Sequence, residues 1–286
     1  MPILANPVFW VAAILALGLV AWFLYVENNT LEVTYYQVPL KTLPKDFDGL
    51  RIALISDLHG SIFGQEQSDI ASAIEDFKPD MIAIAGDLID RRSFTCEAAE
   101  KLLKSIKNQS PIFYVTGNHE ISVDNFGAFE DLLSKYGVNL LRNQVQIIEK
   151  GNSKIAVAGL DDPLTFSPDS QEQRKGCQRS LSQIAERIGP NTFSILLAHR
   201  PHLLEIYASY DIDLVLSGHA HGGMIKIPRV GGLVSPGQGF LPKYTQGIYR
   251  YDETAMVVSR GLGNSGPFQL RLFNKPELVL LTLKSM

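Results

Sequence analysis

Short, continuous apolar runs alternate with stretches of helical period along most of this 286-residue chain. Apolar runs this short, bounded by turn residues, are typical of strands buried on both faces, and helices between them favour a mainly parallel sheet. We therefore expect an α/β body. The predicted strands are Leu50–Ser56, Met81–Gly86, Ile112–Gly117, Ile155–Gly159, Phe193–Ala198, Asp213–Gly218 and Leu278–Leu283, and the predicted helices are Gln65–Phe77, Cys96–Lys107, Phe126–Tyr136, Gln171–Ile188 and Leu203–Tyr210.

Most of these apolar runs end in side chains that are suited to metal binding. In open α/β sheets ligands bind outside the carboxyl ends of the strands, so we expect these side chains to converge. A helix cap or a turn would explain any one of them, but five such strand ends together favour a common site. In chain order the residues are Asp57, His59, Asp87, Asp90, Asn118, His119, Glu120, His199, His219 and His221.

The residue types narrow the kind of metal. The strand ends hold five of the six histidines in the chain, together with Asp and Asn. Nitrogen and oxygen donors of this kind suit divalent Zn, Fe or Mn. Cys96 and Cys177 are the chain's only cysteines and lack metal-ligand spacing, which excludes a Cys-rich metal site or a disulfide framework. Seven of the candidates are too many ligands for one tetrahedral ion and fit two ions that share a carboxylate.

Five motifs occur in a fixed order, namely SDLHG (56–60), GDLID (86–90), GNHE (117–120), AH (198–199) and GHAHGG (218–223). In this series the chain resembles the calcineurin-like metallophosphoesterase superfamily, from about Leu50 to the C-terminus. The apolar N-terminal run, FDGLRIALISDLHG, LPKYTQGIYR and SRGLGNSG are similar to its membrane-anchored bacterial branch, the YkuE/YaeI-like phosphoesterases. The resemblance implies a four-layer α/β/β/α sandwich, with a dinuclear metal site at the C-terminal ends of the strands.

The resemblance also implies a ligand set and a reaction. A hydroxide held between two divalent ions (Mn, Zn or Fe) would attack phosphorus in line, without a covalent enzyme intermediate. Two ions at such a spacing also neutralise the phosphate oxygens. By similarity, one ion would be held by Asp57, His59 and His221, the other by Asn118, His199 and His219, and Asp87 would bridge them.

Three more residues receive catalytic roles from the resemblance. His119 would face the leaving-group oxygen as an acid or transition-state donor. Asp90 would orient that imidazole and raise its basicity, although a helix N-cap is nearly as good an interpretation. Arg91 lies where related phosphatases keep a phosphate-binding arginine, but a solvated surface charge is slightly favoured there.

An uncharged run of 19 residues, Val8–Val26, precedes the body. As a helix it would span about 28 Å, close to the ~30 Å of a hydrocarbon core. A retained anchor is favoured over a cleaved signal peptide, since no basic side chain precedes the run and no small residues follow it. It is favoured over a buried core helix, since the run has no polar face. We expect an anchor over 1–27, a connector and first strand over 28–49, and the metallophosphoesterase domain over 50–286.

The function that fits best is a single-pass phosphoesterase of the cell membrane that cleaves a phosphodiester or pyrophosphate. Lys41 and Lys45, the first basic residues after the run, lean weakly towards a cytoplasmic body. The lipid bilayer is then a partner, and a lipid-linked or cell-envelope phosphate, of the UDP-diacylglucosamine type for instance, is a plausible substrate. A net charge of −4 without Lys/Arg blocks argues against nucleic acid. No protein partner is inferred.

Two alternatives stay open. A phosphomonoesterase or phosphatase would use the same ligands, because one fold hosts many substrates. A non-catalytic scaffold is less favoured, since the ligand set is complete.

Three minor features have plainer interpretations. The segment Phe240–Tyr244 is favoured as a packed loop over one that dips into a membrane interface. His202 is expected at a helix start or in the core. Gly261, Gly263 and Gly266 lack the strand–helix context of a phosphate-binding loop and indicate turns.

Overall fold

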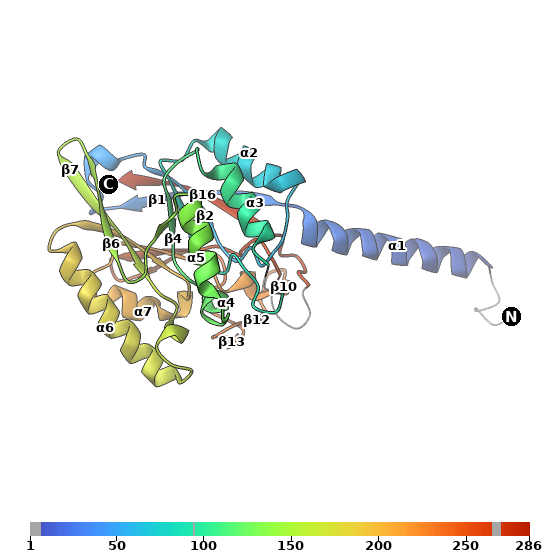
Figure 1. Ribbon diagram of the computed structural model, residues 1–286. Coiled ribbons are helices and arrows are strands. Elements are labelled where there is room, and N and C mark those ends of the chain that lie inside the picture. The colour runs from blue at the N-terminus through green and yellow to red at the C-terminus, as the bar shows by residue number, and fades with distance from the viewer. Residues whose placement is uncertain (1–6, 94, 265–269) are drawn as a thin grey trace.

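The computed structural model describes residues 7–93, 95–264 and 270–286, and within these ranges two six-stranded sheets form the body (Figure 1). The helices are α1 (Pro7–Asn29), α2 (Ser68–Phe77), α3 (Glu97–Ile106), α4 (Asn118–Ile121), α5 (Phe126–Lys135), α6 (Ser170–Ile188) and α7 (Leu204–Ala208). The strands are β1 (Glu32–Leu40), β2 (Arg51–Ile55), β3 (Met81–Ile84), β4 (Ile112–Tyr114), β5 (Asn139–Leu140), β6 (Val145–Lys150), β7 (Ser153–Leu160), β8 (Phe193–Ala198), β9 (Leu214–Ser217), β10 (Lys226–Ile227), β11 (Gly231–Gly232), β12 (Val234–Ser235), β13 (Gly239–Phe240), β14 (Gly247–Tyr251), β15 (Thr254–Val258) and β16 (Glu277–Ser285).

The first sheet joins the two ends of the chain. Its strand order is β1-β16-β2-β3-β4-β5, and only the β16–β2 pair is antiparallel. β1 pairs in parallel with β16 from Glu32↔Glu277 to Leu40↔Ser285. The segment that follows α1 is therefore an edge strand of this sheet as well as a connector.

The second sheet has the order β14-β15-β9-β8-β7-β6. Its four central strands, β15, β9, β8 and β7, are parallel, and the two edge strands are antiparallel to their neighbours. Two short hairpins, β10–β11 and β12–β13, lie between β9 and β14 in the chain. β2, β3, β4, β8 and β9 are the strands whose C-terminal ends carry the polar motifs.

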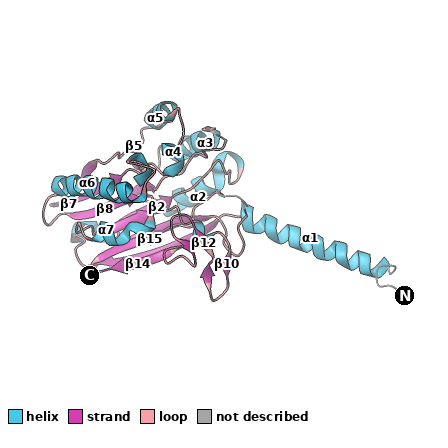
Figure 2. Ribbon diagram, turned by 90° about the horizontal axis from the view of Figure 1, so that it is seen from below, coloured by secondary structure: helices cyan, strands magenta, loops and turns pink. Residues whose placement is uncertain are grey.

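Four layers result from burial on both faces of both sheets. Side chains from β2, β8 and β15, such as Leu54, Leu197 and Val257, fill the space between the sheets. The outer face of the first sheet packs on α2, α3 and α5, and the outer face of the second packs on α6 and α7 (Figure 2). The expected α/β/β/α architecture is confirmed.

β6, which was not predicted, shows why an edge strand is hard to recognise in a sequence. β6 lies at the edge of the second sheet and is mostly exposed or half-buried along its length. Its partner β7 is buried over six consecutive residues and was predicted over most of its length. An edge strand with solvent on one side needs few apolar residues, so its sequence is not distinctive.

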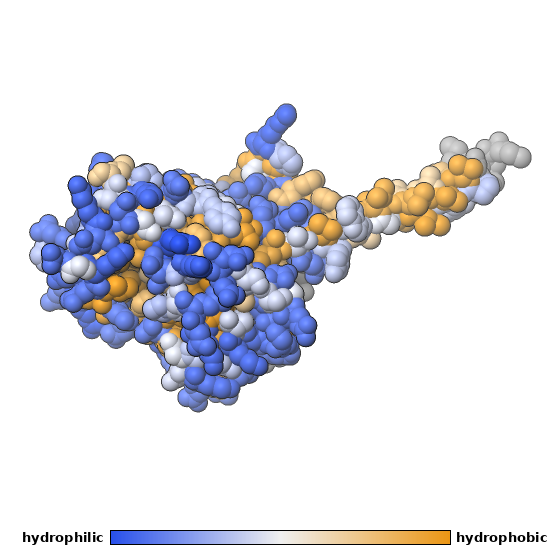
Figure 3. Space-filling view, turned by 90° about the horizontal axis from the view of Figure 1, so that it is seen from above, coloured by the Kyte–Doolittle hydropathy of each residue, from blue (hydrophilic) through white to orange (hydrophobic). Residues whose placement is uncertain are grey.

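α1 projects from the body as a long apolar helix (Figure 3). It is the one helix in the described ranges that is long and apolar enough to cross a membrane, with a mean hydropathy of 2.3 in a window that is 0% buried. A signal sequence meets the same criteria, and residues 1–6 of the expected anchor lie outside the described ranges.

Candidate metal centre

The polar strand ends meet at one edge of the two sheets. β2, β3 and β4 end in loops of the first sheet, and β8 and β9 end in loops of the second. Three groups of three side chains form there, and within each group the ligand atoms lie within 4.8 Å of one another; one of them, His59, Asp90 and His119, shares His59 with the first group named below. The first group, called here the first half, is Asp57, His59 and His221. The second group, called the second half, is Asp87, His199 and His219.

The first half is arranged around the carboxylate of Asp57. His221 Nε2 lies 3.4 Å from Asp57 Oδ1, and His59 Nε2 lies 3.8 Å from the same oxygen. The two imidazoles stack with centroids 5.1 Å apart. Three donors of two residue types therefore face one point.

The second half is arranged around two imidazoles. His219 Nδ1 lies 3.0 Å from His199 Nε2, which in turn lies 3.2 Å from Asp87 Oδ2. His199 Nδ1 donates to the carbonyl of Ala85 at 2.7 Å, so Nδ1 carries a proton and Nε2 is the ring nitrogen that faces the centre. This contact fixes the orientation of the ring.

Asp87 joins the two halves. Its Oδ2 lies 3.2 Å from His199 Nε2 in the second half and 3.7 Å from His59 Nε2 in the first. Its other oxygen, Oδ1, accepts the backbone N–H of His119 at 2.8 Å. One carboxylate oxygen thus faces an imidazole of each half.

Left-handed backbone is concentrated at these ligands. Asp57, His59, Asp87, His219 and His221 have φ angles of 50°, 45°, 56°, 65° and 47°. Non-glycine residues adopt this region at a cost of about 1–2 kcal/mol each, and such strain persists only where the surroundings impose it. The strand ends turn sharply here so that side chains from five loops reach a common centre.

Charges at the centre favour ligand binding. Burial opposes ionisation of Asp57 and Asp87, but the facing imidazoles outweigh it and hold the pKa of both carboxyls below the usual range. Burial lowers the pKa of His221 to about 3 and that of His219 well below its usual value. Ionised carboxylates and neutral imidazoles are the forms that bind metals.

His199 differs from these two histidines. Burial opposes its charge, yet Asp87 and Asp57 raise its pKa to about 10. The cluster therefore favours a positive charge at its centre, which a divalent ion would supply.

Several buried nitrogen and oxygen atoms of the expected ligands have no hydrogen-bond partner within the described residues. They are both ring nitrogens of His59, Nδ1 of His221 and Oδ1 of Asn118. A buried polar atom without a partner costs about 1–3 kcal/mol, so these atoms need a ligand. Asn118 begins α4 beside His119, whose N–H binds Asp87. The donor set fits a divalent ion such as Zn, Fe or Mn.

His119 lies next to the first half and is oriented by backbone. Its ring meets that of His59 edge-on, with centroids 4.4 Å apart. The backbone N–H of Arg91 donates to His119 Nδ1 at 3.2 Å, which assigns the proton of the neutral ring to Nε2. Burial lowers the pKa of His119, so the neutral ring is favoured.

Asp90 and Arg91 lie beside His119 but make other contacts. Asp90 Oδ1 is 3.5 Å from His119 Nδ1, while Arg92 binds both Asp90 oxygens, with Nη2 to Oδ2 at 2.7 Å. Arg91 is exposed, and its Nη1 lies 3.5 Å from Ser122 Oγ. The Arg91 backbone, not the Asp90 carboxylate, makes the hydrogen bond to His119.

Glu120 has a role that sequence reasoning left unassigned. Its fully buried carboxylate accepts the backbone N–H groups of Asp87 and Gly117 at 2.8 Å and of Ile89 at 3.1 Å. Burial and the Asp87 charge raise its pKa to about 7. It ties the loop after β3 to the loop after β4. A buried acid in the GNHE motif was the available signal, but its partners are backbone groups that no pattern reveals.

Two of the three minor features, His202 and Gly261, lie beside ligand residues. His202 is the second residue of a short 3-10 turn, Pro201–Leu203, and is half-buried, with its ring centroid 6.2 Å from that of His219. In the 240–244 segment Tyr244 is buried, while Phe240 and Leu241 are exposed by 71% and 55%. Gly261 packs against Asp57, where an added Cβ would lie 2.6 Å from the Asp57 Cβ. Gly266 lies outside the described residues.

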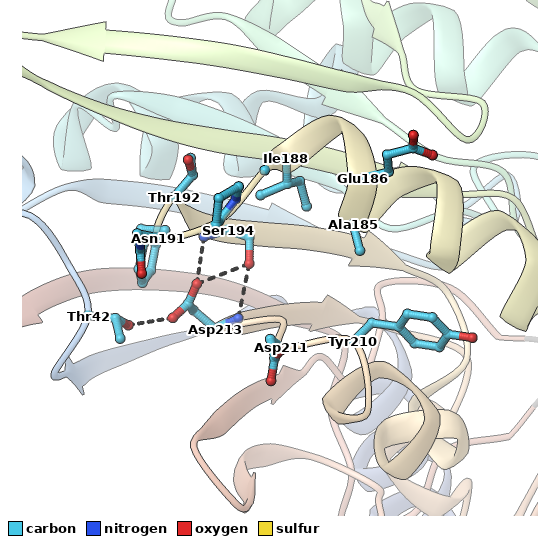
Figure 4. Close-up of a pocket in the computed structure, with 13 residues that line it drawn as sticks. Thr42, Ala185, Glu186, Ile188, Asn191, Thr192, Ser194, Tyr210, Asp211 and Asp213 are labelled. Carbon is cyan, nitrogen blue, oxygen red and sulfur yellow. Dashed lines mark hydrogen bonds between the residues drawn. The ribbon is translucent and has the colours of Figure 1, made fainter.

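A separate pocket opens away from the metal centre, at the N-terminal ends of β8 and β9 (Figure 4). Asp213 there accepts hydrogen bonds from Ser194 and from Thr42 Oγ1. Its carboxylate is satisfied by these contacts, so it serves to join the strands.

Comparison with known proteins gives consistent matches. The family model described as calcineurin-like phosphoesterase matches residues 50–223. The uncharacterized metallophosphoesterase YkuE of Bacillus subtilis is 32% identical over 91% of this chain and 88% of its own. Phosphodiesterase YaeI of Escherichia coli is 28% identical over 82% of both chains.

A third relative is larger. The transmembrane protein with metallophosphoesterase domain of Danio rerio is 29% identical over 88% of this chain, which spans 57% of that relative's length. The matched family region contains all seven expected ligands, and six of them, all except Asn118, lie in the first and second halves. The chain belongs to the calcineurin-like phosphoesterase family and is a metal-dependent hydrolase of phosphoester bonds.

Proposed function

We propose that the protein is a phosphodiesterase that binds two divalent ions, one in each half, with Asp87 as the bridging ligand. The observation that carries this proposal is the position of Asp87 Oδ2, 3.7 Å from His59 Nε2 and 3.2 Å from His199 Nε2. Asn118 Oδ1, which is buried and without a partner among the described residues, is the further ligand of the second half. The name of the Escherichia coli relative supports the diester preference.

Bound ions would supply electrostatic stabilisation of the phosphate oxygens and would activate a water molecule. The chain's own residues then have positioning and hydrogen-bonding roles. His119 donates its Nε2–H as a hydrogen bond to the leaving-group oxygen and stabilises the negative charge that develops there as the phosphorus–oxygen bond breaks. Asp90, whose Oδ1 lies 3.5 Å from His119 Nδ1, orients that imidazole and raises its basicity. Arg91, exposed beside His119, contacts a non-bridging phosphate oxygen.

The substrate that we favour is a lipid-linked phosphodiester or pyrophosphate at a membrane surface. α1 would hold the body at the bilayer as a single-pass anchor. Lys41 and Lys45, which follow the helix, favour the cytoplasmic side for the body. Phe240 and Leu241 expose apolar side chains, as does Phe273, which contacts Phe23 of α1 at 5.4 Å between ring centroids. Exposed apolar groups next to an anchor favour an amphiphilic substrate.

The test uses the full chain in detergent micelles. Metal is removed with a chelator and restored as Mn, Zn or Fe, and cleavage of bis-p-nitrophenyl phosphate is measured beside p-nitrophenyl phosphate. We expect metal-dependent diester cleavage that Asp87→Asn lacks, because the bridging carboxylate serves both halves.

Preferred cleavage of the monoester would replace the diesterase by a phosphatase. If the protein binds metal but hydrolyses neither of the two esters, nor a lipid pyrophosphate presented in vesicles, a non-catalytic scaffold would be favoured. Turnover by Asp87→Asn close to that of the unaltered chain would overturn the bridged site.

A further inference from the structure

The last turn of α1 is built into the body, unlike the rest of that helix. Most side chains before it are exposed, whereas Glu27 is only 7% exposed. Phe23, one turn earlier, packs against Phe273 with ring centroids 5.4 Å apart. A buried carboxylate at the end of an apolar helix is costly unless it has a partner. Glu27 has one, since its Oε2 accepts the backbone N–H of Asn274 at 3.0 Å.

Asn28 binds the same segment with both ends of its amide. Its Oδ1 accepts the backbone N–H of Arg271 at 2.7 Å and Nδ2 of Asn264 at 3.0 Å. Its Nδ2 donates to the Arg271 carbonyl at 3.0 Å and to the Leu24 carbonyl at 2.7 Å. Glu27 and Asn28 together hold residues 271–274.

One route leads from this segment to His221 in the first half. Asn274 is fully buried, and its Nδ2 donates to the backbone carbonyl of His221 at 2.7 Å and to that of Met224 at 3.0 Å. An added Cβ on Gly222 would lie 2.0 Å from Asn274 Oδ1, so the two loops are in close contact. His221 has left-handed backbone, which the surroundings must impose. Asn274 supplies part of that restraint.

A second route leads to Asp57. The buried guanidinium of Arg271 donates to the carbonyl of Gly263 at 2.6 Å and to that of Arg260 at 2.9 Å. The backbone N–H of Gly263 then donates to the carbonyl of Asp57 at 2.5 Å. Both routes end in the first half. The contacts that orient the second half come from Glu120, from the carbonyl of Ala85 and, at His219, from the Asp57 carboxylate, which accepts the His219 backbone N–H at 3.0 Å.

We infer that α1 stays in the working protein and that its last turn, Glu27 and Asn28, is a positioning element for the metal ligands of the first half. The helix then does more than anchor the body, because removal of this turn removes hydrogen bonds to Asn274 and Arg271. These two residues in turn position the backbone of His221 and Asp57. The inference rests on the proposed metal site but not on any substrate.

Asn28→Ala with Asn29→Ala as its matched control tests this inference. Asn29 is the next residue, is exposed, and donates to the carbonyl of Tyr25 within its own helix. Full-length chains in lipid nanodiscs are stripped of metal and titrated with Mn²⁺, and bound ions are counted by electron paramagnetic resonance. His221→Ala and His199→Ala provide the reference spectra for loss of the first and the second half.

We expect Asn28→Ala to weaken binding of the first-half ion about 10- to 100-fold, the range found for outer partners of metal ligands. The second-half ion should bind as in the unaltered chain, and Asn29→Ala should bind both ions normally. Normal binding of both ions by Asn28→Ala, or weakening confined to the second half, overturns the inference.

Conservative variants separate positioning from folding. Glu27→Gln keeps an oxygen for the Asn274 N–H, whereas Glu27→Ala removes it. We expect Glu27→Gln to bind metal nearly as the unaltered chain does and Glu27→Ala to resemble Asn28→Ala, with circular dichroism unchanged in both. Equal metal binding by the two Glu27 variants would contradict the role of that oxygen. This comparison does not depend on Asn28→Ala, so it tests the inference even if Asn28→Ala does not fold.

Retention of α1 is tested directly by the intact mass of the protein purified from membranes of its own cells. A mass that includes residues 7–29 supports the inference, and a mature chain that begins after Asn28 refutes it. Metal titration needs no substrate, so a chain that binds both ions yet cleaves no tested ester would leave this inference standing while it overturns the proposed phosphodiesterase.

Discussion

The two halves of the metal centre have similar ligands but different supports. The second half is oriented by Glu120, in α4 after β4, and by the carbonyl of Ala85, directly after β3. The first half also has local support, since the backbone N–H groups of Asp57 and His59 donate to the carbonyls of Gly86 and Asp87. In addition it is held by Gly263, Arg271 and Asn274, which lie far along the chain from Asp57. The second half is thus mainly a local product of the strand ends, whereas the first depends also on segments near the chain's termini.

This difference coincides with the extent of the family match. Residues 50–223 include all the expected ligands and Glu120, whereas Glu27, Asn28, Arg271 and Asn274 lie outside that range. The ligands of the first half are therefore part of the family region, but part of their support comes from the segments around it. Substitutions in the two kinds of support should separate the halves.

The largest effect is expected at His119, which touches both halves through its ring and its backbone N–H. His119→Gln should lower turnover of a diester about 100- to 1,000-fold, the range for loss of one hydrogen-bond donor to the transition state, with both ions still bound. The measurement is kcat together with the metal content of the same sample. Loss of metal in proportion to activity would instead make His119 a ligand, in the third group that it forms with His59 and Asp90.

A pair of glycines provides the most direct comparison of the halves. Gly86 has a φ of 89°, and an added Cβ would lie 2.6 Å from the Gly117 nitrogen and 2.8 Å from His199 Nδ1. Gly261 has a φ of 73° and packs against Asp57. Gly86→Ala and Gly261→Ala should each lower the free energy of unfolding by about 2–5 kcal/mol, from backbone strain plus overpacking. Gly86→Ala should lose the second-half ion and Gly261→Ala the first.

Gly60→Ala is the control for this pair. Its φ is 79°, but nothing lies within 4 Å of an added Cβ, so only the backbone strain of about 1–2 kcal/mol applies. Denaturant unfolding and metal analysis give both quantities. If each of the two variants lost both ions equally, the halves would not be separable and the comparison would fail.

The sequence allowed the ligands to be predicted better than their supports. Strands buried on both faces need continuous apolar runs, so β2, β3, β4, β8 and β9 and the polar residues after them were predicted from local pattern alone. The parallel pairing of β1 with β16 joins residues at opposite ends of the chain and leaves no local signal. Glu120, Arg271 and Asn274 act on backbone groups, which every residue has, so their roles emerge only from the fold.

A smaller effect is expected at Glu120, and it should be confined to the second half. Glu120→Gln replaces one of the two oxygens that accept backbone N–H groups by an amide that is itself a donor. We expect binding of the second-half ion to weaken about 10- to 100-fold, while the first-half ion binds normally. Glu97→Gln, at an exposed pair with Lys101, is the matched control. Weaker binding of the first-half ion alone would reverse the assignment of supports.

The smallest effects are expected at the two arginines that follow Asp90, where neither half is touched. Arg91→Ala removes an exposed charge beside His119, and exposed charges contribute about 1 kcal/mol or less, so KM for a diester should rise about fivefold at most with kcat unchanged.

Arg92→Ala instead removes the guanidinium that binds the Asp90 carboxylate at 2.7 Å. Asp90 then keeps the backbone N–H of residue 92 as its donor, at 2.9 Å, and its charge acts more strongly on His119, so the pH dependence of kcat should move to higher pH while KM does not change. An unchanged pH profile would show that Asp90 serves the loop after β3 and not the imidazole, and the orientation of the His119 Nε2–H would then depend on the Arg91 backbone alone.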